Sequence, residues 1–168
     1  SPQSFKARRL QAWVQAHRPA LTWWCPQLPP SPQAAWQLIQ HGIANWPTQT
    51  MAVVGSSLGG FYATALAEAT GCPAVLLNPA IDPARDLRGH VGEQTQFHDP
   101  SEHFDFRVEY ITELQVLTAS QITRPERYAA IIAKGDELLD WLETTWHYPG
   151  AHIRLIEGGD HALSDFDV

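Results

Sequence analysis

The sequence is poor in the features that mark secreted, zinc-binding and membrane proteins. It has two cysteines in 168 residues, Cys25 and Cys72, which lie far apart and form no CxxC pair. A disulfide framework or a thiolate zinc site is therefore not expected, and the scarcity of cysteine indicates a reducing, cytoplasmic compartment. No apolar run is long enough to cross a bilayer, so we also expect no membrane span.

Basic residues are scarce as well, with 11 Lys and Arg against 18 Asp and Glu and a net charge of −7. Nucleic-acid binding needs clustered Lys and Arg, so we expect no nucleic-acid partner. Hydrophobic residues make up 44% of the chain and charged residues 17%, a composition typical of globular proteins. The length predicts one domain over residues 1–168. Nothing in the sequence indicates the oligomeric state.

The segment Gly-Ser-Ser-Leu-Gly-Gly at residues 55–60 carries the clearest chemical signal. It follows the apolar run 51–54 and precedes a helical pattern, which is the setting of a G-x-S-x-G nucleophile turn between a strand and a helix. Gly55 and Gly59 bracket Ser57 and let the backbone pass on both sides of it. We therefore predict Ser57 as a nucleophile, although the same motif also occurs in glycine-rich turns without chemistry.

Apolar runs alternate with helical patterns along much of the chain. Buried strands are predicted at 51–54, 74–77, 128–133 and 152–156. Helices are predicted at 4–17, from Pro32 onward, at 58–70 and after residue 137. A short aromatic strand is also predicted at 21–25. Continuous apolar strands between helices are typical of a parallel sheet with helices on both faces, so we predict an α/β fold.

Residues 80–125 interrupt this alternation. Within them, the stretch 97–105 contains two histidines and three acidic residues, a combination that metal sites use. The spacing matches no dedicated ligand pattern, so we interpret the segment as a solvated lid and predict no metal. A helical stretch around 113–118 returns the chain to the sheet.

A serine needs a base to take its proton and an acid to orient that base. Reactive groups of a parallel sheet gather in loops at the carboxyl ends of its strands. Asp136 follows one predicted strand and His161 follows the last, so that the order Ser57, Asp136, His161 is that of α/β-hydrolases. Glu137 and Asp140 are alternatives for the acid, and Asp136 could instead cap the next helix.

The tetrahedral intermediate also needs hydrogen-bond donors for its oxyanion. The backbone N–H of Leu58, at the start of the helix after the serine, is predicted as one donor. The second donor normally comes from a loop that follows an earlier strand.

Several stretches together resemble a known family. They are Ser1-Pro2-x-Ser4-x-Lys6-Ala7, Pro26-Gln27-Leu28-Pro29-Pro30, residues 54–64, Asn78-Pro79-Ala80, residues 135–140 and residues 157–162. The chain resembles, over nearly its whole length, the small bacterial α/β-hydrolase esterases of the YqiA type, which are close to the YcfP-type proteins. The resemblance implies an α/β-hydrolase fold, with Ser57 as nucleophile, Asp136 as acid and His161 as base. It also implies hydrolysis of carboxylic esters or acyl thioesters without a metal or organic cofactor.

The family's pattern has further elements at both ends. It begins with a strand and a His-Gly-Phe loop before the Ser-Pro with which this sequence starts, and that loop is the expected source of the second oxyanion donor. A helix is also expected beyond His161. We therefore expect the fold to lack its first strand within these residues.

The sequence thus predicts a serine esterase or thioesterase whose partner is a small acyl ester or thioester. Two alternatives stay open, namely a non-catalytic binding module of the same fold and an acyltransferase with the same three residues. Five aromatic residues are candidates for an acyl pocket, although core packing is the expected use of most of them: Trp23, Trp24, Phe97, Phe104 and Phe106.

Overall fold

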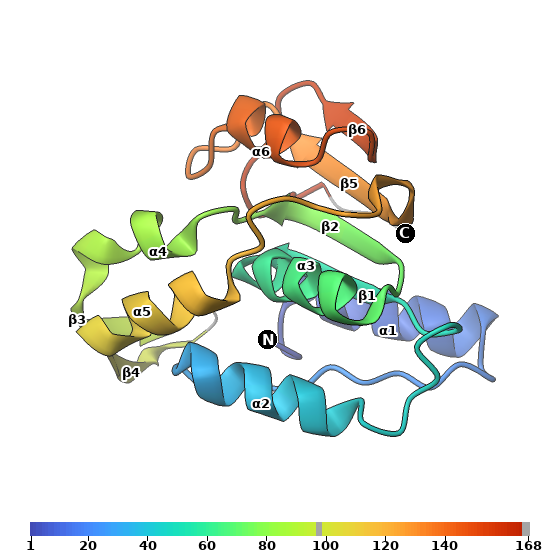
Figure 1. Cartoon of the computed structure of the whole chain (residues 1–168), viewed down its shortest axis with the longest axis horizontal. Helices are drawn as coiled ribbons and strands as arrows, with labels where there is room; N and C mark the ends of the chain where they lie inside the picture. The colour runs from blue at the N-terminus through green and yellow to red at the C-terminus, as the bar shows by residue number, and fades with distance from the viewer. Residues whose placement is uncertain (97–98, 166–168) are drawn as a thin grey trace.

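A parallel sheet of four strands forms the centre of the protein (Figure 1). The computed structural model describes residues 1–96 and 99–165. The strands stand in the order β1-β2-β5-β6 and span Val53–Ser57, Ala74–Pro79, Tyr128–Ala133 and His152–Ile156. Every neighbouring pair is parallel. The carboxyl ends of all four strands therefore lie at one edge of the sheet.

Several helices begin or end at residues with recognisable capping chemistry. Ser4 caps α1 (Phe5–His17), and Ser31 caps α2 (Pro32–Gly42) by accepting a hydrogen bond from the N–H of Ala34. α3 spans Leu58–Thr70 and ends at Gly71, whose φ of 74° is the left-handed conformation that glycine adopts without strain. α6 spans Trp141–His147. The predicted limits of α3, β5 and β6 are confirmed.

Alternate side chains of the strands serve the two faces of the sheet. Leu76 of β2 packs with residues of α3 and with Tyr148, which follows α6, whereas Leu77 packs on the other side with Ala133 and Leu163. In Figure 1, α3 lies in front of the sheet and α1 lies behind it. The predicted mainly parallel sheet with helices is therefore confirmed.

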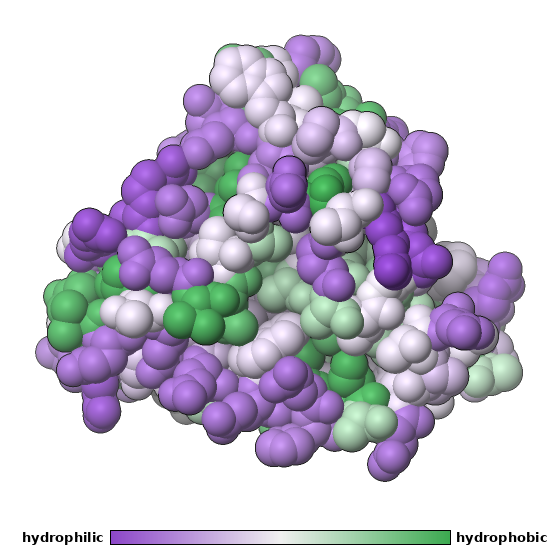
Figure 2. Space-filling model, in the orientation of Figure 1, coloured by the Kyte–Doolittle hydropathy of each residue, from purple (hydrophilic) through white to green (hydrophobic). Residues whose placement is uncertain are grey.

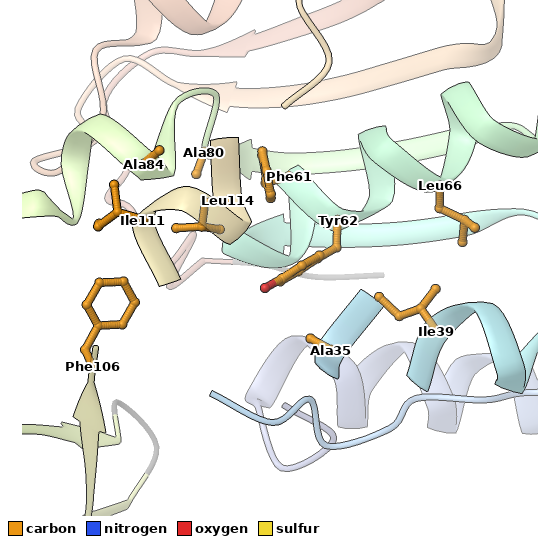
Figure 3. Packing of buried hydrophobic residues seen from close by; sticks show 10 residues of the cluster. All are labelled: Ala35, Ile39, Phe61, Tyr62, Leu66, Ala80, Ala84, Phe106, Ile111 and Leu114. Atoms are coloured by element: carbon orange, nitrogen blue, oxygen red, sulfur yellow. The ribbon is translucent and has the colours of Figure 1, made fainter. Parts of the chain in front are cut away.

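The segment between β2 and β5 forms structure of its own. It contains α4 (Pro83–Asp86), a 3-10 turn (Arg88–His90), the antiparallel strands β3 (Gly92–Gln96) and β4 (Asp99–Phe106), α5 (Val108–Leu117) and a second 3-10 turn (Pro125–Arg127). Figure 3 shows side chains of α2, α3 and α5 directed toward a shared apolar cluster. A carboxylate oxygen of Glu113 on α5 also accepts hydrogen bonds from Ser31 and Gln33. These contacts fix α5 against α2.

Part of the surface stays apolar. α5 leaves Val108 and Val116 exposed, and in Figure 2 hydrophobic side chains gather toward the left of the view, on the side where Figure 1 shows α5. Among the described residues, no helix has the combination of length and apolar character that a membrane crossing requires.

The predicted strand at 21–25 is wrong, because these residues form an irregular extended segment. Trp24 stacks obliquely on Trp46, with ring centroids 6.4 Å apart, and covers Gly42, where any Cβ would strike its ring. Trp24 therefore packs on the end of α2, although it stays 38% exposed.

His147 gives the fold a testable dependence on pH. Burial lowers the pKa of His147 below its ordinary value of 6.5, against the opposing effect of Glu143. The unfolded chain therefore takes up this proton first as the pH falls, and the folded state loses stability below pH 6.5. We expect His147→Gln to weaken the fall in unfolding free energy between about pH 7 and pH 5. Urea unfolding at each pH measures the slope, and equal slopes for wild type and His147→Gln would contradict the prediction.

Candidate active site

The turn from β1 into α3 holds Ser57 in an unusual backbone conformation. Its φ is 54° and its ψ is −126°, a combination that a non-glycine residue rarely adopts. Although Ser57 precedes the first residue of α3, its hydroxyl makes no capping hydrogen bond to the helix. The side chain is therefore free to act elsewhere, as expected for a serine at a nucleophile turn.

Close backbone packing explains the glycine at position 55. A Cβ there would lie 2.2 Å from the carbonyl oxygen of Gly59 and 2.7 Å from the Cβ of Ala63. Gly60 is also constrained, because its Cβ would lie 2.6 Å from the Cβ of Pro79. Gly59 differs from our expectation, since a Cβ there would meet no atom within 4 Å. The motif thus needs glycine on one side of Ser57 for steric reasons and not on the other.

The structure brings the three sequence-predicted side chains together. His161 Nε2 lies 2.8 Å from Ser57 Oγ, and His161 Nδ1 lies 2.8 Å from Asp136 Oδ2. A carboxylate can only accept hydrogen bonds, so Nδ1 carries the proton shared with Asp136. Nε2 of the neutral ring is then left to accept the hydroxyl proton of Ser57.

Asp136 is held in place by the loop that follows β5. Its Oδ1 accepts hydrogen bonds from the backbone N–H groups of Leu138 and Leu139, both at 2.9 Å, while Oδ2 faces His161. The Asp136 side chain is 3% exposed and that of His161 is 11% exposed. Both oxygens of the buried carboxylate are therefore partnered, which fixes its direction.

The loops that carry Asp136 and His161 meet where Gly135 approaches Gly158 and Gly159. The N–H of Gly135 donates to the carbonyl of Gly158 at 2.9 Å. A Cβ on Gly135 would lie 2.2 Å from the carbonyl oxygen of Gly159, and Gly159 itself has a φ of 76°. This close approach lets the Asp136 and His161 loops touch.

The alternative acids occupy different places. Glu137 Oε2 accepts a hydrogen bond from the backbone N–H of His161 at 2.9 Å, so it holds the histidine loop and not the imidazole. Asp140 caps α6 by accepting from the N–H of Leu142. The sequence predicted a helix after residue 137 with Asp136 as its possible cap, but α6 begins only at Trp141. The helix starts later because the N–H groups of Leu138 and Leu139 donate to the Asp136 carboxylate in a separate turn.

A backbone donor and a lysine side chain lie next to the three residues of the site. Leu58 is the first residue of α3, so its N–H is one of the helix donors without an intrahelical partner. Lys6 of α1 donates to the carbonyl of Ala162, next to His161. Burial lowers the pKa of Lys6, against the attraction of Asp160 and Asp136. Sequence reasoning gave Lys6 no role in this site, because a charged residue on an amphipathic helix is ordinarily interpreted as part of its polar face.

The candidates for an acyl pocket or a metal site lie elsewhere. Some of them pack in the core, and others fall outside the described residues. Phe106 is buried and meets Tyr110 edge to face, and Phe104 packs on the same cluster, so both belong to the core. His98 and Phe97 lie outside the described residues. Within residues 1–96 and 99–165, no group of three or more His, Cys, Asp or Glu side chains is placed to hold a metal ion.

Solved structures of other proteins share this architecture. Alpha/beta hydrolase domain-containing protein 10 from mouse superposes with a TM-score of 0.67 and 15% identity, over 96% of this chain and 77% of that one. Est1E from Butyrivibrio proteoclasticus gives a TM-score of 0.55 and 14% identity, over 80% of this chain and 63% of that one. Methylketone Synthase I from tomato gives a TM-score of 0.52 and 15% identity, over 80% of this chain and 72% of that one. The protein therefore has the predicted α/β-hydrolase fold.

The family follows from the sequence over its whole length. Residues 1–168 match the Uncharacterised protein family UPF0227. The chain belongs to this family, which is the YqiA/YcfP family that the motifs predict.

The contrast between Gly55 and Gly59 predicts opposite effects of the same substitution. Gly55→Ala places a methyl group against the backbone of Gly59, so we expect a loss of about 1–3 kcal/mol or more in unfolding free energy. Gly59→Ala meets open space in a helix, where alanine is favoured over glycine by up to about 1 kcal/mol, so we expect no loss. Denaturant unfolding of both variants measures this. A Gly55→Ala variant as stable as Gly59→Ala would disprove the steric argument.

Proposed function

We propose that this protein is a serine hydrolase that cleaves carboxylic esters or acyl thioesters. The observation that carries the proposal is the continuous chain of two 2.8 Å contacts from Asp136 through His161 to Ser57. The buried carboxylate and the left-handed backbone of the serine support it. Together with His161, these features provide a base aimed at a hydroxyl that makes no helix-capping hydrogen bond.

The reaction follows from this geometry. As Ser57 Oγ forms a bond to the substrate carbonyl carbon, its proton passes to His161 Nε2, and Asp136 stabilises the resulting imidazolium. The carbonyl oxygen takes the negative charge, and the N–H of Leu58 donates to it. A donor of this kind contributes about 3–4 kcal/mol to the transition state. His161 then protonates the departing oxygen or sulfur, the bond to the leaving group breaks, and water repeats both steps on the acyl-enzyme.

The surroundings of Ser57 support an acyl group with an apolar portion. Leu58, next to the nucleophile, and Leu139, next to the acid, both pack against the apolar cluster of Figure 3. One structure of the similarly folded Est1E contains bound ferulic acid. We therefore propose esters and thioesters of hydrophobic acids as the substrate class.

The first test replaces each of the two adjacent serines. Ser57→Ala removes the nucleophile, so we expect it to abolish both hydrolysis of p-nitrophenyl esters and labelling by a fluorophosphonate. Ser56→Ala is the matched control, because it removes a hydroxyl one residue away that the mechanism does not use. Gel fluorescence and mass spectrometry locate the label.

Three outcomes separate the candidate functions. Labelling at Ser57 with release of the free acid supports the hydrolase. Labelling with acyl transfer to an added alcohol in preference to water favours an acyltransferase. A folded wild-type protein that neither labels nor turns over would favour a non-catalytic binding module.

A second test concerns the acid. Asp136→Asn keeps the size of the side chain but removes the charge that fixes the imidazole tautomer, so we expect kcat to fall by about 10⁴-fold. Asp140→Asn is the matched control, since an asparagine caps α6 as an aspartate does. Steady-state kinetics on one ester measures both. Equal activity of Asp136→Asn and wild type would remove Asp136 from the mechanism.

A further inference from the structure

The end of β2 contacts both halves of the proposed site through three consecutive residues. The N–H of Ala80 donates to the carbonyl of Ser57 at 3.0 Å. Pro79 packs against Gly60, the third residue of α3, so closely that no Cβ fits between them. Asn78 reaches in the other direction, toward the loop that carries His161. A single strand end therefore touches the nucleophile turn and the histidine loop.

The Asn78 side chain uses all of its principal hydrogen-bonding groups. Its Nδ2 donates to the backbone carbonyls of Asp160 and His161, both at 3.1 Å. Its Oδ1 accepts a hydrogen bond from the N–H of Ala133, the last residue of β5, at 2.8 Å. The residue is 1% exposed, so water cannot replace these bonds without a rearrangement.

The chemistry of an asparagine fits this position in two ways. The contacts require one acceptor and two donors on adjacent atoms, and the carboxamide provides this set where a carboxylate provides acceptors only. The backbone φ of Asn78 is 40°, a left-handed conformation that asparagine, aspartate and glycine tolerate better than other residues. A residue that served only to end a strand would need neither feature.

We propose that Asn78 is a positioning residue that sets the distance between Ser57 and His161. This inference rests on the proposed serine-hydrolase function. Asn78 holds the backbone of His161 itself, whereas the next two residues, Pro79 and Ala80, contact the nucleophile turn. The end of β2 therefore fixes the position of both reacting groups. Loss of the Asn78 amide frees the histidine loop while the nucleophile turn keeps its own contacts.

The other contacts to this loop hold different atoms from those that Asn78 holds. Glu137 accepts from the N–H of His161, and Lys6 donates to the carbonyl of Ala162. Glu137 is exposed, whereas Asn78 is buried. Water therefore competes less with the contacts of Asn78 than with that of Glu137.

The test uses the full chain with two substitutions at this position. Asn78→Asp keeps size, backbone tolerance and the acceptor for Ala133, but replaces the donor with an oxygen that faces two carbonyls. Asn78→Gly keeps the backbone conformation and removes the side chain, so it carries the test if Asn78→Asp does not fold. Tyr148→Phe is the matched control. It removes a buried hydroxyl that is bonded to Thr64 of α3 and not to the loop that carries His161.

Three measurements are made at a temperature where thermal unfolding finds each variant folded. We expect both Asn78 variants to lower kcat by about 10–100-fold, because displacement of a catalytic group by 1 Å has an effect of that size. KM should change less than about threefold, since no substrate contact is removed. Fluorophosphonate labelling of Ser57 should slow in parallel. The low-field proton resonance of the His161–Asp136 hydrogen bond should weaken in both variants and persist in Tyr148→Phe.

The outcomes separate this inference from the function on which it rests. Wild-type labelling at Ser57 with unchanged kcat in Asn78→Asp or Asn78→Gly would overturn the positioning role and leave the hydrolase in place. An equal loss in Tyr148→Phe would also overturn it, because the effect would then be general destabilisation. Absence of labelling in the wild type would overturn the hydrolase and the positioning role together.

Discussion

The contact between Gly55 and the carbonyl of Gly59 constrains the entire nucleophile turn. With 2.2 Å between that oxygen and a Cβ at position 55, the chain can reverse from strand to helix only if this residue has no side chain. The reversal leaves Ser57 with a φ of 54° and its hydroxyl outside the helix. Strain at this one residue is tolerated because β1 pairs with β2 and α3 packs on both strands.

The parallel sheet converts sequence order into spatial proximity. Asp136 and His161 follow β5 and β6, and the carboxyl ends of these strands lie at the same edge as Ser57. Hydrogen bonds between the loops that carry Asp136 and His161 then hold these two residues close together. The bond from the N–H of Gly135 to the carbonyl of Gly158 is one example. The sheet alone brings the loops to one edge, whereas side-chain contacts align individual atoms. Asn78, Glu137 and Lys6 belong to this second level of organisation.

Residue patterns were sufficient for elements whose stability is local or depends on simple burial. Gly71 marks the end of α3 because its left-handed conformation is intrinsic to the residue, and β5 appears as an uninterrupted apolar run. The aromatic segment 21–25 misled the prediction, since strand formation requires a neighbour to pair with and these residues have none among the described strands. The start of α6 was misplaced for a related reason. Asp136 binds N–H groups that a helix would otherwise use, and this competition depends on the position of His161.

The same distinction applies to the site. The proximity of Ser57, Asp136 and His161 was predictable because their residue types and order match the chemistry that a serine nucleophile would require. Asn78 carries no such signal, since an asparagine after an apolar run is also a common end to a strand. Its role depends on three backbone groups from two other segments, none of them encoded near it in the sequence. Residue type and order can thus indicate candidate reactive groups, whereas a residue that is proposed to position them can be identified only when its backbone partners are known.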